Sequence, residues 1–252
     1  MNFKSLEDCF NYNKLEKYQY IIIFSDVFKL MLKNKEGFNN FCTELENYIH
    51  YLRRDKTILL PTFNLGFYKS LQTGNDPKYI STGYLNKFLS KRINFHRSKR
   101  PIGNFSVIGK NKKKILELKQ QTLFGEDSII SFLAKNQTLG MGVGIDPENF
   151  AWTVNHVCEE DMRVPYRFFK RFKGLNCDTN ERVEEKVFVK KQRMKIINDE
   201  TIIPKELLKK KKINKVNYKK INLIFTNLND HYKEGIRILK KDLYGLTKNV
   251  GR

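Results

Sequence analysis

The 252-residue sequence has little of what builds metal centres, disulfide frameworks or membrane anchors. Its four cysteines lie far apart, with no C-x-x-C pair and no cluster of histidines, which speaks against a zinc site and a disulfide framework. Its longest strictly apolar run, Ile21 to Phe24, is far shorter than the roughly 20 residues that span a bilayer. The first residues lack the apolar segment of a signal peptide. We therefore expect a cytoplasmic protein without a metal.

Acidic residues are scarce relative to basic ones. The chain has 27 Asp and Glu against 48 Lys and Arg, a net charge of +21 at pH 7. This excess predicts an anionic ligand, and nucleic acid, an acidic membrane face, a nucleotide-linked sugar and the phosphates of coenzyme A all satisfy it. No RNP-like, helix-turn-helix or zinc-finger pattern is present, so we expect no nucleic acid. Peripheral contact with an anionic membrane and a homodimer stay open.

Hydrophobic residues make up 40% of the chain, enough for a substantial core. Tyr20 to Phe24 reads as a buried strand, Phe38 to Leu52 as an amphipathic helix and Thr57 to Leu60 as a second strand. Strands alternating with helices predict an α/β fold. We expect one domain over 1–252, with 174–252 as a less clearly defined C-terminal lobe.

The remaining sequence predicts further elements, separated by turns. Strands are expected at 105–108, 138–143 and 221–225, helices at 84–89, 112–121, 128–134, 150–160, 204–212 and 230–243, a hairpin at 183–197, and a long surface loop at 66–79.

Two glycine-rich stretches match nucleotide-binding motifs poorly. Five residues separate Gly103 from Gly109, where a phosphate loop needs four, and Gly144 follows Gly142 too early for a dinucleotide fingerprint.

Several short segments follow one another in the order found in one enzyme family. Thr153 to Glu159 reads T-V-N-H-V-C-E and is similar to the family's T-x-x-H-x-x-E element, and Arg97 to Pro101 resembles its R-S-x-H-P signature. The other matching segments are Tyr20 to Phe28, Leu60 to Asn64, Ser81 to Leu85, Phe124 to Ser128 and Leu139 to Val143. Together they resemble the aminoglycoside 3-N-acetyltransferase family. Pro165 to Lys170 further resembles members found with surface-glycan genes.

The resemblance implies an aminoglycoside 3-N-acetyltransferase-like α/β fold, a central mixed sheet flanked by helices, and acetyl-CoA as cosubstrate. By position in the family, Ser25 and Asp26 after the first strand, with Arg97 and Ser98, are the candidate coenzyme contacts. An arginine suits a phosphate through its guanidinium fork. The signature histidine is replaced here, and the serine expected after the proline is also absent. Arg100 and Asn104 stand at these two positions.

Acetyl transfer to an amine needs a base for the amine proton and donors for the carbonyl oxygen. His156 would be the base, because imidazole titrates near neutrality, Glu159 would orient it or bind the incoming ammonium, and Thr153 would offer a hydroxyl. Cys158 lies two residues from His156, on a different helix face, so a covalent cysteine mechanism is disfavoured. The candidate contacts to the acceptor are Thr62, Asn64, Asp127 and Glu160.

These observations predict an acetyl-CoA-dependent N-acetyltransferase that modifies an amino sugar. Aminoglycosides are polycations that favour an acidic site, whereas this basic chain favours a nucleotide- or lipid-linked sugar in surface-glycan assembly. Two alternatives stay open: an acetyltransferase of aminoglycoside antibiotics, and a basic binding protein without catalysis.

Overall fold

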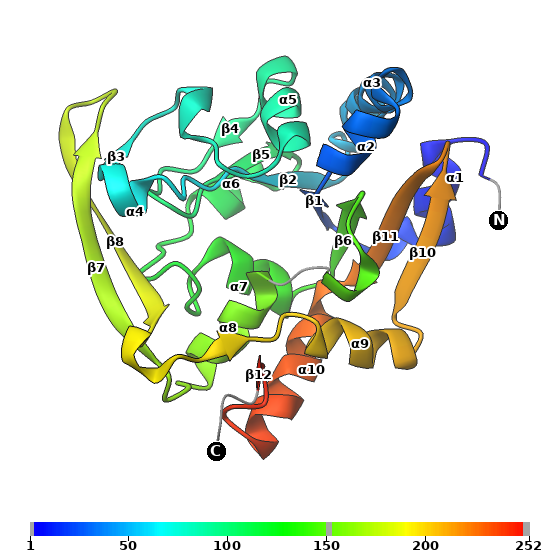
Figure 1. The fold of residues 1–252 in the computed structure, drawn as a ribbon. Coiled ribbons are helices and arrows are strands. Elements are labelled where there is room, and N and C mark those ends of the chain that lie inside the picture. The colour runs from blue at the N-terminus through cyan, green and yellow to red at the C-terminus, as the bar shows by residue number, and fades with distance from the viewer. Residues whose placement is uncertain (1–2, 150–152, 249–252) are drawn as a thin grey trace.

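The computed structural model describes residues 3–149 and 153–248, and a mixed seven-stranded sheet forms its centre (Figure 1). Its strands are β1 (Tyr20–Ser25), β2 (Thr57–Pro61), β4 (His96–Arg97), β5 (Phe105–Gly109), β6 (Thr138–Val143), β10 (Ile213–Tyr218) and β11 (Ile221–Asn227). The strand order is β10-β11-β6-β1-β2-β5-β4. β1 is parallel to β2 and β6, and the other pairs are antiparallel. The predicted α/β class with a central mixed sheet is confirmed.

The central strand β1 has a core on each side because successive strand residues point to opposite faces. Ile22 and Phe24 pack in one hydrophobic cluster, and Ile21 and Ile23 pack in the other. A continuous apolar run is what a parallel strand buried on both faces requires. The sequence of β1 therefore suits an interior strand that is covered on both faces.

Helices cover both faces of the sheet (Figure 1). Buried residues of α1 (Leu6–Tyr12), α3 (Lys35–Leu52) and α5 (Tyr84–Arg92) belong to the cluster that contains Ile21. Buried residues of α6 (Lys112–Leu116), α7 (Ile129–Lys135), α8 (Thr153–Asp161), α9 (Ile202–Lys209) and α10 (Leu228–Lys241) belong to the cluster that contains Ile22. The short helices are α2 (Phe28–Lys33), α4 (Phe67–Ser70) and the 3-10 turns η1 (Leu15–Lys17), η2 (Pro77–Tyr79), η3 (Pro147–Asn149) and η4 (Gln192–Met194).

A long antiparallel hairpin stands beside the central sheet (Figure 1). It consists of β7 (Arg167–Asn176) and β8 (Glu181–Lys190), and the short strand β3 (Gln72–Thr73) pairs with β7 in parallel. Gly174 lets β7 approach this segment closely, because a Cβ at that position would lie 2.1 Å from the carbonyl oxygen of Leu71. A last small pair joins β9 (Ile197–Asn198) to β12 (Thr247–Lys248).

Several predicted bounds need correction. The hairpin expected at 183–197 is formed by β7 and β8, one strand earlier in the chain. The helix expected at 204–212 ends at Lys209, because the following lysines lead into β10, which was not predicted. The loop expected at 66–79 contains α4, β3 and η2, and the helix expected at 112–121 stops at Leu116.

Residues after 174 are divided between two places. Part of them forms the hairpin, and β10 and β11 extend the central sheet through the pairing of β11 with β6. The single-domain organisation with a C-terminal lobe stays a prediction. Across the two described stretches, no helix combines the length and the apolar character that crossing a membrane demands.

Candidate active site

Helix α8 carries the side chains expected to be catalytic. The helix predicted over 150–160 is observed from Thr153 to Asp161, and its first three predicted positions lie outside the described residues. Val154, Val157 and Cys158 bury one side of α8 in the core. This packing fixes the direction in which His156 projects.

Glu159 is the centre of a buried hydrogen-bond network. One carboxylate oxygen, Oε2, lies 2.6 Å from Nδ1 of His156 and 2.9 Å from Nη2 of Arg167. The other, Oε1, accepts from the hydroxyl of Tyr166 at 2.8 Å and from Nδ2 of Asn198 at 3.1 Å. The side chain of Glu159 is fully buried. A carboxylate offers about four acceptor positions, so these donors satisfy it.

The contact with Glu159 fixes the tautomer of His156. Because an ionised carboxylate can only accept a hydrogen bond, we assign the ring hydrogen of His156 to Nδ1, and Nε2 is then the nitrogen that can take up a proton. Nη2 of Arg167 lies 3.2 Å from the same Nδ1 and 2.9 Å from the carboxylate oxygen Oε2 of Glu159. The ring also packs against Phe124, with centroids 4.9 Å apart. His156 is thereby held from two sides.

The charge on Glu159 is stabilised by its partners. Burial alone would raise the pKa of this carboxyl, but the hydrogen bond and charge of His156, together with Arg167 and Tyr166, hold the pKa below its ordinary value. The structure thus places a stabilised anion against the imidazole. Whether Glu159 orients His156 or binds an incoming ammonium group stays a prediction.

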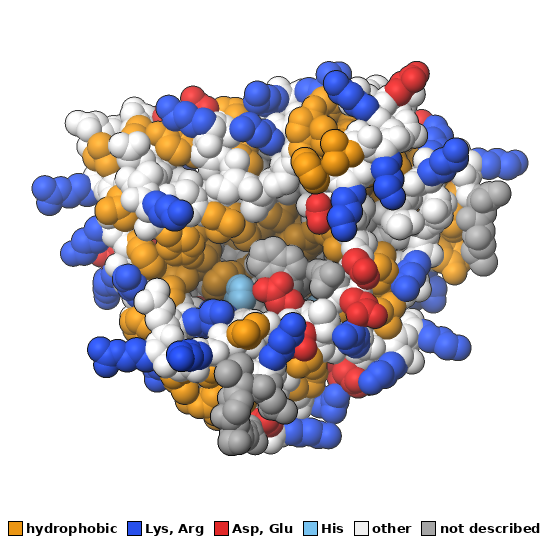
Figure 2. All heavy atoms as spheres, in the orientation of Figure 1, with side chains coloured by type: hydrophobic (Ala, Val, Ile, Leu, Met, Phe, Trp, Pro, Cys, Tyr) orange, Lys and Arg blue, Asp and Glu red, His pale blue; other side chains and the backbone are white. Residues whose placement is uncertain are grey.

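His156 and Thr153 line a cavity of about 310 Å³ between α8 and the hairpin. Its wall is mostly apolar, and Phe63, Phe124 and Val187 contribute to it. The charged residues in the lining are Arg167, Lys190 and Glu200. In Figure 2 this face of the molecule is hollowed, and a histidine lies in the hollow beside apolar and acidic side chains. A mostly apolar wall with a few convergent polar groups is typical of a small-molecule site.

The two acidic residues predicted to contact the acceptor, Glu160 and Asp127, are not part of the lining of this cavity. Glu160 is buried, and its Oε1 accepts from the hydroxyl of Thr122, in the loop before α7, at 2.5 Å. Burial raises the pKa of Glu160, and the bond from Thr122 opposes this only in part. Asp127 is exposed. The lining of the cavity includes neither residue, and their contact with an acceptor stays a prediction.

Arg97 and Ser98 hold the backbone together in the structure. Arg97 donates to the carbonyl oxygens of Gly74 at 2.7 Å and of Thr62 at 3.1 Å, and burial lowers its pKa. The hydroxyl of Ser98 accepts from the amide of Phe105 at 2.9 Å. Arg97 thereby attaches β4 to the segments after β2 and β3, and Ser98 joins the end of β4 to β5. A role in coenzyme binding remains a prediction for both.

Thr62 and Asn64 are buried in the loop after β2. Asn64 donates to the carbonyl oxygen of Gln72 at 2.9 Å, and Thr62 lies against Ser106. Neither lines the cavity, although Phe63 between them does. The loop therefore supplies an apolar wall, and the predicted polar contacts with an acceptor stay untested.

The tip of β1 suits a ligand better. The hydroxyl of Ser25 is buried and makes no hydrogen bond within the described residues. Gly83, at φ +58°, leaves open the space beside it, because a Cβ there would lie 2.8 Å from this oxygen. Asp26 is exposed next to it. An orphaned hydroxyl in such a cradle is a suitable partner for a ligand amide.

The replaced signature residue has a defined partner. Arg100 forms a partly buried ion pair with Glu185 of β8 and donates to the carbonyl oxygen of Gln120 at 2.7 Å. Asn104 accepts from the amide of Arg100 at 3.1 Å. Arg100 thus attaches the loop after β4 to the hairpin, and Asn104 stabilises the loop itself. Arg100 does not line the cavity.

Sequence reasoning missed Arg167, Tyr166 and Asn198, which complete the environment of Glu159. Arg167 and Tyr166 lie in the segment Pro165 to Lys170, which carries no catalytic motif. Asn198 follows a basic stretch without any distinguishing pattern. A buried carboxylate needs partners, so the position of Glu159 on a helix with apolar neighbours is the one signal that could have prompted a search for an arginine.

Cys158 faces away from His156 and into the core. It is fully buried, its sulfur lies 3.6 Å from the carbonyl oxygen of Tyr232, and burial strongly raises its pKa. A buried thiol without thiolate character is a poor nucleophile. Within the two described stretches, no group of three or more His, Cys, Asp or Glu is placed to hold a metal ion.

The family model described as aminoglycoside 3-N-acetyltransferase matches residues 55–240. The chain belongs to the aminoglycoside 3-N-acetyltransferase family. The match includes α8, the hairpin and the loop after β2. No curated protein sequence matches the chain significantly.

Solved structures share the aminoglycoside 3-N-acetyltransferase fold with this chain. A histidine-to-alanine mutant of the aminoglycoside acetyltransferase AAC(3)-IVa in complex with a gentamicin has a TM-score of 0.68 at 13% identity, over 90% of this chain and 83% of that one. AAC-VIa bound to sisomicin has a TM-score of 0.68 at 14% identity, over 94% and 97%. YokD from Bacillus subtilis has a TM-score of 0.66 at 14% identity, over 92% and 91%. The predicted fold is confirmed.

The buried anion at Glu159 makes stability depend on pH. Its folded pKa lies below the ordinary value of 4.5, so its stabilisation is complete above that value and is lost as the pH falls toward the folded pKa. We predict that the difference in unfolding free energy between the wild type and Glu159→Gln narrows from about pH 6 to about pH 3. Urea denaturation at each pH measures it. A difference that stays constant over this range would contradict the network.

Proposed function

We propose that this member of the family transfers an acetyl group from acetyl-CoA to the amine of an amino sugar, with His156 as general base. The observation that carries the proposal is the contact between Glu159 and Nδ1 of His156 at the wall of the cavity. A base oriented by a buried carboxylate is the arrangement that proton abstraction from a nucleophile uses. The family supports acetyl transfer as the reaction.

Each side chain at the cavity has a distinct role in this proposal. Acetyl-CoA supplies an acetyl thioester. Nε2 of His156 takes the proton of the amine as its nitrogen bonds to the acetyl carbon, the carbon–sulfur bond breaks, and the proton passes to the departing thiolate. Glu159 keeps the imidazole in the required tautomer, and the hydroxyl of Thr153, which lines the same cavity, donates to the acetyl oxygen.

The residues present fit coenzyme A at the tip of β1. The orphaned hydroxyl of Ser25 would bind an amide of the pantetheine arm in the cradle left by Gly83. Asp26 borders this position, whereas Arg97 and Ser98 are already engaged with backbone groups. We therefore favour Ser25 over Arg97 and Ser98 as the residue that contacts the coenzyme.

Charge supports an anionic acceptor, such as a nucleotide- or lipid-linked amino sugar of surface-glycan assembly. The chain carries +21, and besides Arg167, which is paired with Glu159, the charged residues of the cavity lining are Lys190 and Glu200, so the positive potential comes from the chain as a whole. A positive potential attracts a sugar that bears phosphate and repels a polycation.

An aminoglycoside antibiotic is the second candidate acceptor. The structures of AAC(3)-IVa and AAC-VIa contain gentamicin, apramycin or sisomicin. In this chain, Glu200 supplies a carboxylate at the cavity that could bind an ammonium group. This observation keeps antibiotic acetylation as the alternative.

Replacing the base tests the proposed function. We predict that His156→Ala lowers the rate of CoA release from acetyl-CoA and a productive acceptor by roughly 100- to 10,000-fold, because the amine proton loses its acceptor. Thermal stabilisation by acetyl-CoA should persist in the variant. The matched control is His96→Ala, since His96 is exposed and does not line the cavity. Full turnover by His156→Ala would refute the mechanism, and no stabilisation of the wild type at about 1 mM acetyl-CoA would favour a binding protein without catalysis.

The two candidate acceptors are separated by direct comparison. We predict faster CoA release with nucleotide-linked amino sugars than with kanamycin-type drugs at equal concentration, and a smaller difference at high salt because salt screens the attraction. The assay measures free thiol. A higher rate with the drugs at every salt concentration would transfer the proposal to antibiotic acetylation.

A further inference from the structure

A basic and aromatic groove adjoins the catalytic cavity. It has a volume of about 590 Å³ and lies along the hairpin and η4. Three aromatic rings line it, from Tyr68, Phe168 and Phe172, and the charged residues of its lining are all cationic: Lys170, Lys190, Lys191 and Arg193. Small-molecule sites commonly span about 300 to 1,000 Å³. The groove is therefore large enough for a ligand.

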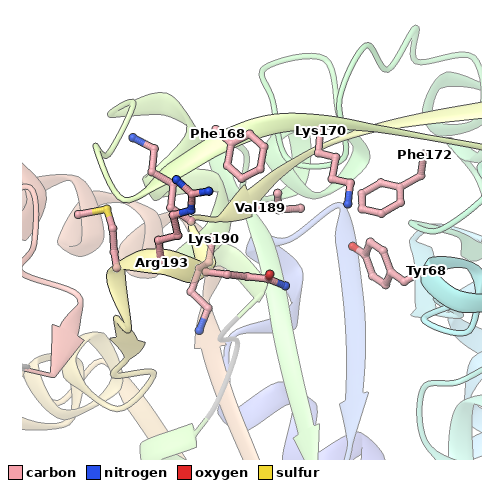
Figure 3. A pocket seen from close by; sticks show the side chains of 10 residues that line it. Tyr68, Phe168, Lys170, Phe172, Val189, Lys190 and Arg193 are labelled. Carbon is pink, nitrogen blue, oxygen red and sulfur yellow. The ribbon is translucent and has the colours of Figure 1, made fainter.

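Strand alternation builds one wall of this groove. Phe168, Lys170 and Phe172 occupy every second position of β7 and project to the same side (Figure 3). Tyr68 meets Phe172 edge to face, with centroids 4.9 Å apart. The ammonium group of Lys170 lies 5.0 Å from the centre of the Phe172 ring. One wall of the groove thus presents both a positive charge and aromatic rings.

The cations of the groove differ from basic residues on the other side of the hairpin. Arg171, the next residue along β7, pairs with Glu184 at 2.5 Å. Lys170 and Arg193 have no carboxylate within 4.0 Å among the described residues, and Phe168 is 43% exposed. Lys191 donates to the carbonyl oxygen of Pro165 at 2.6 Å. Cations without counter-charges beside an exposed ring suit an anion that carries an aromatic base.

The groove and the cavity share Tyr68, Val189 and Lys190. If the amine of a long ligand lies at His156, the opposite end of that ligand can therefore occupy the groove. None of the four coenzyme candidates, Ser25, Asp26, Arg97 and Ser98, lines the groove. Its position thus favours the acceptor over the coenzyme.

We propose that this groove binds the nucleoside diphosphate part of the acceptor substrate, an inference that rests on the proposed acetyl transfer. Lys170 and Arg193 bind the phosphates, and Phe168 stacks on the base. The linked amino sugar then reaches His156 past Tyr68 and Lys190. The groove accordingly selects acceptors that carry a base and two phosphates.

Binding of free nucleoside diphosphates tests the groove without any turnover. Calorimetry would use UDP, GDP, ADP and dTDP as probes at low salt, with and without saturating coenzyme A. We expect at least one probe to bind, Lys170→Gln/Arg193→Gln to weaken its Kd roughly tenfold or more, and Phe168→Ala to weaken it roughly tenfold. The matched control is Arg171→Gln, which removes the same charge on the opposite side of the hairpin and should leave the Kd unchanged. All four residues are exposed, so these variants keep the core intact.

Each outcome decides for or against the groove. Binding that survives saturating coenzyme A and falls in the groove variants supports the acceptor site. No binding by any probe, equal weakening by Arg171→Gln, or loss of binding when coenzyme A is added would overturn it, and the last result would assign the groove to the adenosine diphosphate of the coenzyme. Probe binding without any acetyl transfer would instead remove the proposed function.

Discussion

A fully buried carboxylate, Glu159, is the constraint on which the site depends. It binds His156 of its own helix, Arg167 and Tyr166 at the start of β7, and Asn198 of β9. Loss of one partner of a buried charge pair typically costs about 3–5 kcal/mol. The same carboxylate therefore orients the proposed base and fixes the hairpin beside it, so catalytic geometry and the wall of the cavity are not independent.

A second buried carboxylate anchors the same hairpin from its other strand. Glu185 of β8 pairs with Arg100, the residue that stands where the family signature has histidine. Burial raises the pKa of Glu185 and Arg100 opposes this rise. The hairpin is thus attached to α8 through Glu159 and Arg167, and to the loop after β4 through Arg100 and Glu185. Both attachments hold the groove next to the cavity.

The sequence predicted what local patterns determine. The apolar run of β1 and the three- and four-residue spacing of α3 define their elements without tertiary information, and Thr153, His156 and Glu159 share a short motif on one helix. Long-range partners carry no such pattern: Asn198 reaches Glu159 only because the fold brings β9 to α8. The chemistry of Arg97 suggests a phosphate, yet two backbone carbonyls occupy it. A sequence shows which residues are charged, but it does not show which groups those residues bind in the fold.

The tautomer of His156 tests the central claim most directly, because Nδ1 must carry a hydrogen in order to donate to Glu159. Nitrogen-15 NMR of histidine-labelled protein distinguishes the two ring nitrogens near neutral pH. The account predicts a protonated Nδ1 and an unprotonated Nε2 in the neutral ring of the wild type, with the preference reduced in Glu159→Gln. A neutral ring protonated on Nε2 in the wild type would contradict it.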